Sequence, residues 1–195
     1  MRQLKEGVHV VDIMGGSGCP NLMLCVDNGI PIKTYTFVDI SPDVHVVARA
    51  VVAKQHAFHP HLLPASAVVG FDKRLAQDIR KINAMDLVNL TAKRGPIDMV
   101  AAGFPCAPIS RARRGRGQND TRFPVFLDLC RIINWCQTQQ GGRPVIYLLE
   151  NVCIDADADK AVLDADKLIR AFLGEPSIYI DAPQLGSLSH SWRRF

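Results

Sequence analysis

The chain has 195 residues, 48% of them hydrophobic and 22% charged, and a net charge of +4. This length fits one domain with an adequate core, and the composition is typical of a globular, soluble protein. No apolar run approaches the ~20 residues of a membrane span, and residues 1–6 lack the apolar stretch of a secretory signal, so no membrane partner is predicted. The mild positive charge permits a polyanionic partner without requiring one.

In the first part of the chain, residues 8–14 form an apolar run that ends in Gly15-Gly16-Ser17-Gly18, which predicts a buried strand followed by a tight turn. Residues 35–38 form a second short strand, which ends at Asp39. Residues 44–53 are apolar and lack glycine and proline, and a Ser-Pro-Asp start signal precedes them, so a helix is predicted there.

The remaining elements continue this alternation of strands and helices. In chain order they are strand 67–71, strand 97–102, helix 125–137, strand 145–149, helix 159–172 and strand 177–182. Buried strands separated by helices predict an α/β fold, with a mostly parallel sheet and helices on both faces.

Ligands of such sheets bind beyond the carboxyl ends of the strands. The glycine turn follows the first predicted strand, Asp39 the second, Cys106 the fourth and Glu150 the fifth. This coincidence predicts one active site at that edge of the sheet.

The first two of these positions suit an adenosine-containing cofactor. Glycine lets the backbone approach a ligand closely, and Asp39 can accept hydrogen bonds from ribose hydroxyls. Asp39 can equally cap the following helix, and both roles can hold together. The turn lacks the full G-x-G-x-x-G pattern of dinucleotide-binding proteins.

The other two positions suit covalent catalysis. Cys106 lies in a loop fixed by Pro105 and Pro108, and Glu150 supplies a carboxyl group. The alternatives are a buried cysteine in a proline loop and a glutamate that caps a helix. We interpret most of the other five cysteines as small core residues of a protein from a reducing compartment. No zinc-type spacing of cysteine and histidine occurs, so no metal is predicted.

A basic loop, defined as residues 111–117, follows Cys106. Its arginines suit contact with phosphates and closure over a flipped nucleotide, although a solvated surface loop is the alternative.

In this order, Gly103 to Ser110, Leu149 to Val152 and the glycine turn resemble the DNA cytosine-C5 methyltransferases, most closely the de novo enzymes of animals and plants. The resemblance implies a Rossmann-like methyltransferase sheet and S-adenosylmethionine as cofactor. It covers nearly the whole chain, so residues 1–195 are expected to form one catalytic domain.

The resemblance implies a set of cofactor-binding residues. They come from the first strand and the glycine turn, from the segments 37–40 and 78–80, and from the loop that contains Cys106. They are Asp12, Met14, Gly16, Gly18, Asp39, Ile40, Asp78 and Pro105.

It also implies that the Cys106 thiolate adds to C6 of a flipped cytosine in DNA, that Glu150 acts near N3, and that Arg193 contacts the base and Glu150. Arginines and a serine around the basic loop are the implied DNA contacts. They are Ser110, Arg111, Arg113, Arg114, Arg116 and Arg122.

Members of the family extend further than the segment that ends here at Phe195. We therefore expect an incomplete domain, without a target-recognition segment and truncated before the last antiparallel strand of the sheet. An unfilled slot between the fifth and sixth strands would favour a homo- or hetero-oligomer. The alternatives are a catalytically silent regulatory homologue and a tRNA cytosine methyltransferase. The expected location is the nucleus in a eukaryote and the cytoplasm in a bacterium or virus.

Overall fold

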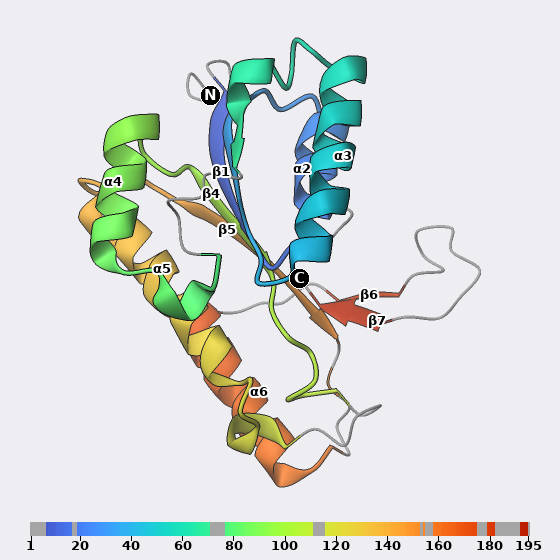
Figure 1. Cartoon of the computed structure of the whole chain (residues 1–195). Coiled ribbons are helices and arrows are strands. Elements are labelled where there is room, and N and C mark those ends of the chain that lie inside the picture. Colours follow the sequence, from blue (N-terminus) through green and yellow to red (C-terminus); the bar gives the residue numbers. More distant parts are fainter. Residues whose placement is uncertain are drawn as a thin grey trace. The chain divides into compact units, whose positions relative to one another are not determined.

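The structure is a computed structural model of the chain (Figure 1). It describes residues 7–16, 19–70, 77–110, 116–152, 154, 158–174, 179–181 and 192–194. For residues 68–70, 179–181 and 192–194 the description covers the backbone alone. The chain forms two compact units, the first made of Met1–Gly103 and Arg131–Leu148 and the second of Phe104–Cys130 and Leu149–Phe195.

A parallel sheet forms the centre of the first unit. Its strands β1 (Val8–Ile13), β2 (Ile32–Val38), β3 (Val68–Gly70) and β4 (Met99–Gly103) lie in the order β3-β2-β1-β4. Every residue of β1 is buried, as expected for a strand with neighbours on both edges and helices on both faces.

This unit also contains the helices α2 (Pro20–Asp27), α3 (Pro42–Phe58) and α4 (Ala84–Arg94). The predicted start of α3 is confirmed, because the Ser41 hydroxyl caps it by accepting a hydrogen bond from the Val44 N–H. The sequence reading missed α2 and α4. The first has only eight residues, and in the second only Leu87 is buried, so neither has a long apolar face that would predict a helix.

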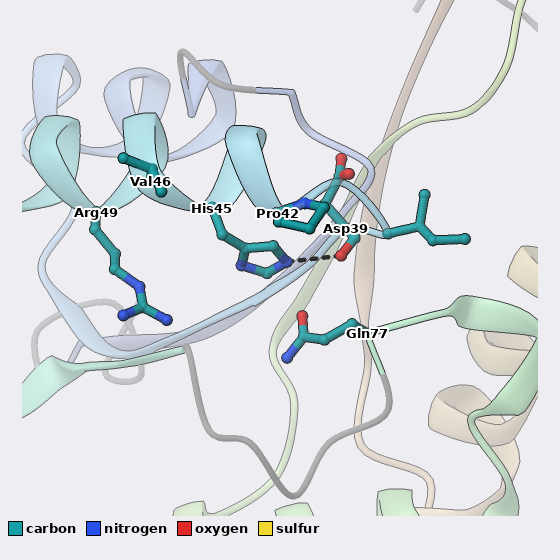
Figure 2. A pocket seen from close by; sticks show the side chains of 7 residues that line it. Asp39, Pro42, His45, Val46, Arg49 and Gln77 are labelled. Carbon is teal, nitrogen blue, oxygen red and sulfur yellow. Dashed lines mark hydrogen bonds between the residues drawn. The ribbon is translucent and has the colours of Figure 1, made fainter.

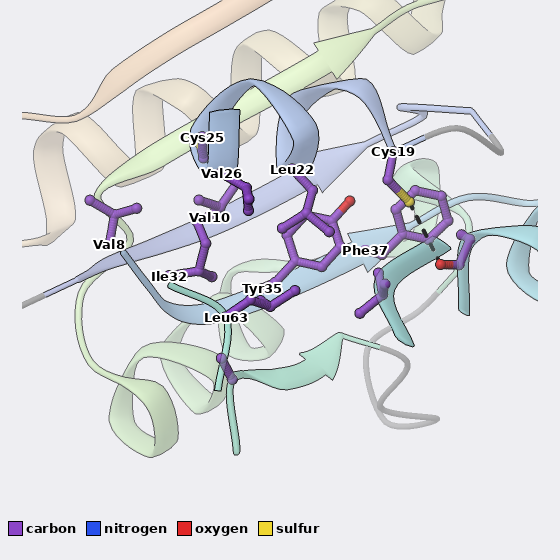
Figure 3. Packing of buried hydrophobic residues seen from close by; sticks show 13 residues of the cluster. Val8, Val10, Cys19, Leu22, Cys25, Val26, Ile32, Tyr35, Phe37 and Leu63 are labelled. Carbon is purple, nitrogen blue, oxygen red and sulfur yellow. Dashed lines mark hydrogen bonds between the residues drawn. The ribbon is translucent and has the colours of Figure 1, made fainter. Parts of the chain in front are cut away.

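The main core of the first unit lies between β1, β2 and helices α2 and α3 (Figure 3). Leu22 of α2 and Tyr35 and Phe37 of β2 are fully buried there. Each such side chain contributes about 1.5–3 kcal/mol through burial. The core therefore holds together the strands and helices that flank the glycine turn.

Two elements run from one unit to the other, namely α5 (Pro124–Gln139) and β5 (Ile146–Val152). In the second unit, β5 continues into a small antiparallel sheet with β7 (Trp192–Arg194) and β6 (Tyr179–Asp181). Helix α6 (Lys160–Leu173) completes this unit. It begins after Asp159 and ends at Gly174, as the sequence predicts.

Aromatic side chains form the core of the second unit. Phe126 of α5 contacts Phe104, Phe123 and Phe172 of α6, with ring centroids 5.1 to 6.2 Å apart. A short helical turn, η4 (Gly117–Asn119), packs directly against α6. A Cβ atom at Gly117 would lie 1.8 Å from the Ala161 carbonyl oxygen, so this close approach requires glycine.

The α/β prediction with a Rossmann-like parallel sheet is confirmed. The expectation that the last antiparallel strand is absent is wrong, because β7 pairs with both β5 and β6. Three residues are too few to show the alternation of a strand, and the arginines of β7 were interpreted only as functional residues. The slot that motivated self-association is thus filled by this chain. Glu150 also differs from its expected place, since it lies within β5 and not after it.

Candidate cofactor turn and candidate catalytic segment

The glycine turn after β1 has an unusual backbone. Met14 and Gly16 have φ angles of 57° and 71°, and the Met14 N–H donates a hydrogen bond to the Val38 carbonyl at the end of β2, at 2.7 Å. A Cβ atom on Gly16 would meet none of the described residues within 4 Å. The turn therefore leaves open space at Gly16, where a ligand can approach the backbone. The predicted Gly18 lies outside the described residues.

Asp12, at the end of β1, is fully buried beneath this turn. Its carboxylate accepts hydrogen bonds from the Tyr35 hydroxyl at 2.7 Å and from the Asn21 side-chain amide at 2.9 Å. Burial raises the pKa of Asp12 to about 6, against the effect of these two hydrogen bonds. The carboxylate is thus engaged inside the protein, and the predicted role of Asp12 in cofactor binding stays a prediction.

Asp39 follows β2 directly, as predicted. Its carboxylate accepts a hydrogen bond from the Ser41 N–H at 2.8 Å, while Ser41 itself caps α3. Its carbonyl oxygen accepts a hydrogen bond from the His45 Nε2–H at 2.6 Å. The segment is therefore fixed from two sides, and the neighbouring Ile40 side chain is 65% exposed.

Asp39 and Ile40 line a pocket of about 410 Å³ in the first unit (Figure 2). The other lining residues come from α3 and from the segment before η2 (Ile79–Lys81): Pro42, His45, Val46, Arg49 and Gln77. Sequence reasoning missed these residues. The histidine one turn into α3 could have been found as a polar group next to Asp39, whereas the approach of Gln77 depends on the fold.

Asp78 lies next to this pocket but is already paired. Its carboxylate accepts hydrogen bonds from Arg80 Nε at 2.9 Å and from the terminal guanidinium nitrogen at 2.7 Å. The hydrogen bond with Arg80 lowers the pKa of Asp78. A ligand amino group would have to share this carboxylate with Arg80, so the role of Asp78 stays a prediction.

In the second unit, Cys106 is exposed and lies at the start of a turn, where its carbonyl oxygen accepts hydrogen bonds from the backbone N–H groups of Ile109 and Ser110. The Asn151 side-chain amide donates a hydrogen bond to the Phe104 carbonyl at 3.0 Å. This bond ties β5, which carries Glu150, to the segment that carries Cys106. The structure thus brings the predicted nucleophile segment and the Glu-Asn pair together.

The segment behind Cys106 is held by an ion pair. Arg122 donates hydrogen bonds to the Asp120 carboxylate at 2.8 and 2.7 Å, and the Arg122 side chain is 46% exposed. The hydrogen bond to Asp120 is the main cause that raises the pKa of Arg122, and an electrostatic interaction with Cys106 adds to it. Arg122 therefore lies within electrostatic reach of Cys106.

The remaining predicted contacts are described only in part. Ser110 is half-buried and Arg116 is exposed. The backbone of Arg193 pairs with Val152 of β5. Arg111, Arg113 and Arg114 lie outside the described residues. Among the described residues, no group of three or more His, Cys, Asp or Glu side chains is arranged to hold a metal ion.

Residues 70–161 match the family model of the C-5 cytosine-specific DNA methylases. This segment of the chain is therefore similar to that family. It includes Cys106 and Glu150, whereas the glycine turn and Asp39 precede it. The family is one of S-adenosylmethionine-dependent methyltransferases.

Curated relatives support this similarity. The chain is 37% identical over 65 residues to the type II methyltransferase M.AluI of Cellulosimicrobium cellulans, and 33% identical over 84 residues to M.HaeII of Haemophilus aegyptius. These matches cover 33% and 43% of this chain but only 11% and 22% of the relatives. The likeness to the de novo enzymes of animals and plants stays a prediction, since these relatives are bacterial.

The fold is similar to the crystal structure of the Dnmt2 methyltransferase of S. pombe. The TM-score is 0.54 at 19% identity, and the match covers 96% of this chain and 48% of that one. This likeness in fold extends to the part of the chain before residue 70, which includes the glycine turn. In the part of the chain that the structure describes, no helix has the length and apolar character needed to cross a membrane.

Proposed function

We propose that the chain transfers a methyl group from S-adenosylmethionine to C5 of cytosine in DNA, through a covalent intermediate on Cys106. The observation that carries this proposal is an exposed thiol in a turn that Asn151 ties to the Glu150 strand, within a segment similar to the cytosine methylase family. Most other described cysteines are fully or nearly fully buried, so the exposure of Cys106 suits a nucleophile.

The chemistry follows from the weak nucleophilicity of cytosine C5. The Cys106 thiolate adds to C6, which moves an electron pair onto C5, and C5 then takes the methyl group. A base removes the C5 proton, the C5–C6 double bond re-forms, and the thiolate leaves. In this scheme the Glu150 carboxyl group stabilises the charge that develops at N3 during the addition.

Several residues of the first unit suit the binding of the methyl donor, S-adenosylmethionine. The open space at Gly16 admits a ligand to the backbone, and Asp39 stands at the end of β2 with the exposed apolar side chain of Ile40 beside it. An acidic group at this position suits ribose hydroxyls, and an apolar side chain suits the face of an adenine ring. The cofactor supplies the electrophilic methyl group.

DNA is the proposed substrate because the relatives are type II methyltransferases and because arginines cluster around Cys106. Arg122 and Arg116 are exposed cations in this region, and they suit contact with phosphates. Such an activity would operate where genomic DNA lies, in the nucleus of a eukaryote or the cytoplasm of a bacterium or virus.

The test is methyl transfer from labelled S-adenosylmethionine to duplex DNA and, in parallel, to tRNA. We expect label in DNA, and a denaturation-resistant complex with DNA that contains 5-fluorocytosine, because fluorine at C5 blocks the elimination. Label in tRNA alone would indicate that the substrate is RNA and not DNA. Cofactor binding without transfer to either would favour a silent regulatory homologue.

A further inference from the structure

A hydrogen-bond network around the buried carboxylate of Asp12 packs against the backbone of the glycine turn. Gly15 lies against the carboxylate of Asp12 so closely that a Cβ atom at Gly15 would be 2.1 Å from Asp12 Oδ1. The backbone of the turn therefore rests on this carboxylate. The neighbouring Met14 has a left-handed backbone, which persists in a non-glycine residue only when the surroundings fix it.

Two other elements hold the carboxylate in place. Tyr35, from β2, is fully buried and donates its hydroxyl to Oδ2, while Asn21, in the first turn of α2, donates its side-chain amide to Oδ1. Each carboxylate oxygen thus has its own donor from a different element. A buried carboxylate that lost one donor would be partly unsatisfied and would shift or take up a proton.

We propose that Tyr35 and Asn21 are positioning residues for the cofactor: they hold Asp12 under Gly15, so that the turn keeps the shape that leaves Gly16 open. Neither residue needs to touch the cofactor. This inference rests on the proposed binding of S-adenosylmethionine at the turn, and it adds two residues, outside the motifs that the sequence suggests, on which that binding depends.

The network also makes cofactor binding sensitive to pH. The groups that interact electrostatically with Asp12 are Tyr35 from β2, Asn21 and Cys25 from α2, Cys19 before α2, and Asp39 after β2. Because the pKa of Asp12 is raised to about 6, the charged form that accepts both hydrogen bonds is lost as pH falls through that value. The hydrogen bond from Tyr35 lowers this pKa, so its removal would move the loss of binding to higher pH.

The experiment compares Tyr35→Phe and Asn21→Leu with Thr36→Val. The control removes another buried hydroxyl from β2, one that contacts His9 and points to the opposite face from Tyr35. The dissociation constant of S-adenosylmethionine is measured by calorimetry on the full chain between pH 5 and pH 8, together with the melting temperature.

At pH 7.5 we expect roughly tenfold weaker binding for each of the first two variants, the scale of one hydrogen bond to a charged group, and no change for the control. The midpoint of the pH dependence should move upward in Tyr35→Phe. Lower melting temperatures with unchanged affinity and midpoint would overturn the inference, because that pattern indicates a purely structural role.

Hydrogen exchange separates this inference from the proposed function. The amide of Met14 should exchange faster in both variants than in the control, whether or not the cofactor is present. If the unaltered chain bound no S-adenosylmethionine, the proposed function would fail, yet faster exchange would still show that the network supports the turn. Asn21 is only half-buried, so its variant should fold even if Tyr35→Phe does not.

Discussion

The side-chain amide of Asn151 donates a hydrogen bond to the carbonyl oxygen of Phe104, at 3.0 Å and across 47 positions of the chain. Both residues are buried, and Cys106 follows Phe104 by two residues. The thiol of the proposed nucleophile is exposed, but the segment that carries it is anchored in the core of the second unit. The shape of this segment therefore depends on a residue that does not need to touch the substrate.

Replacing Asn151 by alanine should destabilise the protein and loosen the nucleophile segment. The substitution leaves a buried carbonyl without its donor, at a cost of about 1–3 kcal/mol. Urea unfolding measures this loss, and methyl transfer should fall along with it. Asn119→Ala, at an exposed position of the same unit, is the matched control and should change neither.

The Cys106→Ser variant should lose methyl transfer and the complex with 5-fluorocytosine DNA, while its affinity for S-adenosylmethionine stays within a factor of about two. Cofactor affinity is retained because the cofactor-binding residues proposed for the first unit do not include the thiol. Activity within tenfold of the unaltered chain would contradict the assignment of the nucleophile.

Asp39→Ala should weaken binding of S-adenosylmethionine by ~1–3 kcal/mol, the scale of hydrogen bonds that involve a charged group. Calorimetric titration measures the change. Asp43→Ala removes an exposed carboxylate four residues later, in the first turn of α3, and controls for the general loss of negative charge. Equal dissociation constants in the two variants would argue against the ribose contact.

Gly117→Ala should cost more stability than Gly141→Ala. Both glycines have positive φ angles, 57° and 68°, so each substitution strains the backbone by roughly 1–2 kcal/mol. At Gly117 the new Cβ would also collide with the Ala161 carbonyl oxygen of α6, whereas at Gly141 no part of the chain that the structure describes lies within 4 Å of it. Thermal unfolding of the two variants isolates the contribution of this contact, and equal melting temperatures would be incompatible with it.

Asp12 should contribute a loss of stability between pH 4 and pH 7, while His9, whose pKa is lowered by burial, contributes in the opposite direction. The pKa of Asp12 in the folded protein is about 6 against an ordinary value of 3.8, so the folded state holds a proton that the unfolded state has already lost. This contribution is present in full below the ordinary value and is lost as pH rises through the folded one. The total is about 3 kcal/mol. Asp12→Asn should remove this dependence, and urea unfolding at pH 4 and pH 7 of both proteins measures the difference.

The sequence predicts the ends of helices better than it predicts a short strand that depends on pairing with distant strands. Caps and breakers are local signals, so Ser41 at the start of α3 and Gly174 at the end of α6 could be predicted correctly. Strand β7 could not, because its three residues form a strand only through their pairing with β5 and β6.

Among the site residues, the segment around Cys106 and the end of β2 at Asp39 follow from short motifs. The partners of Asp12 do not, because Asn21 and Tyr35 lie 9 and 23 positions away and reach it only through the packing of α2 and β2. The same holds for Asn151, which a motif places beside Glu150 but whose partner, the Phe104 carbonyl, follows from the fold alone.

The five described cysteines differ in solvent exposure, so one of them can be labelled selectively. Burial raises the pKa of Cys19 and Cys25 to about 11 and that of Cys130 and Cys136 to about 12, whereas Cys106 faces solvent. A maleimide dye should therefore label Cys106 ahead of these four under mild conditions. A fluorophore at that position would report the arrival of a nucleic acid at the thiol directly, without any need for turnover.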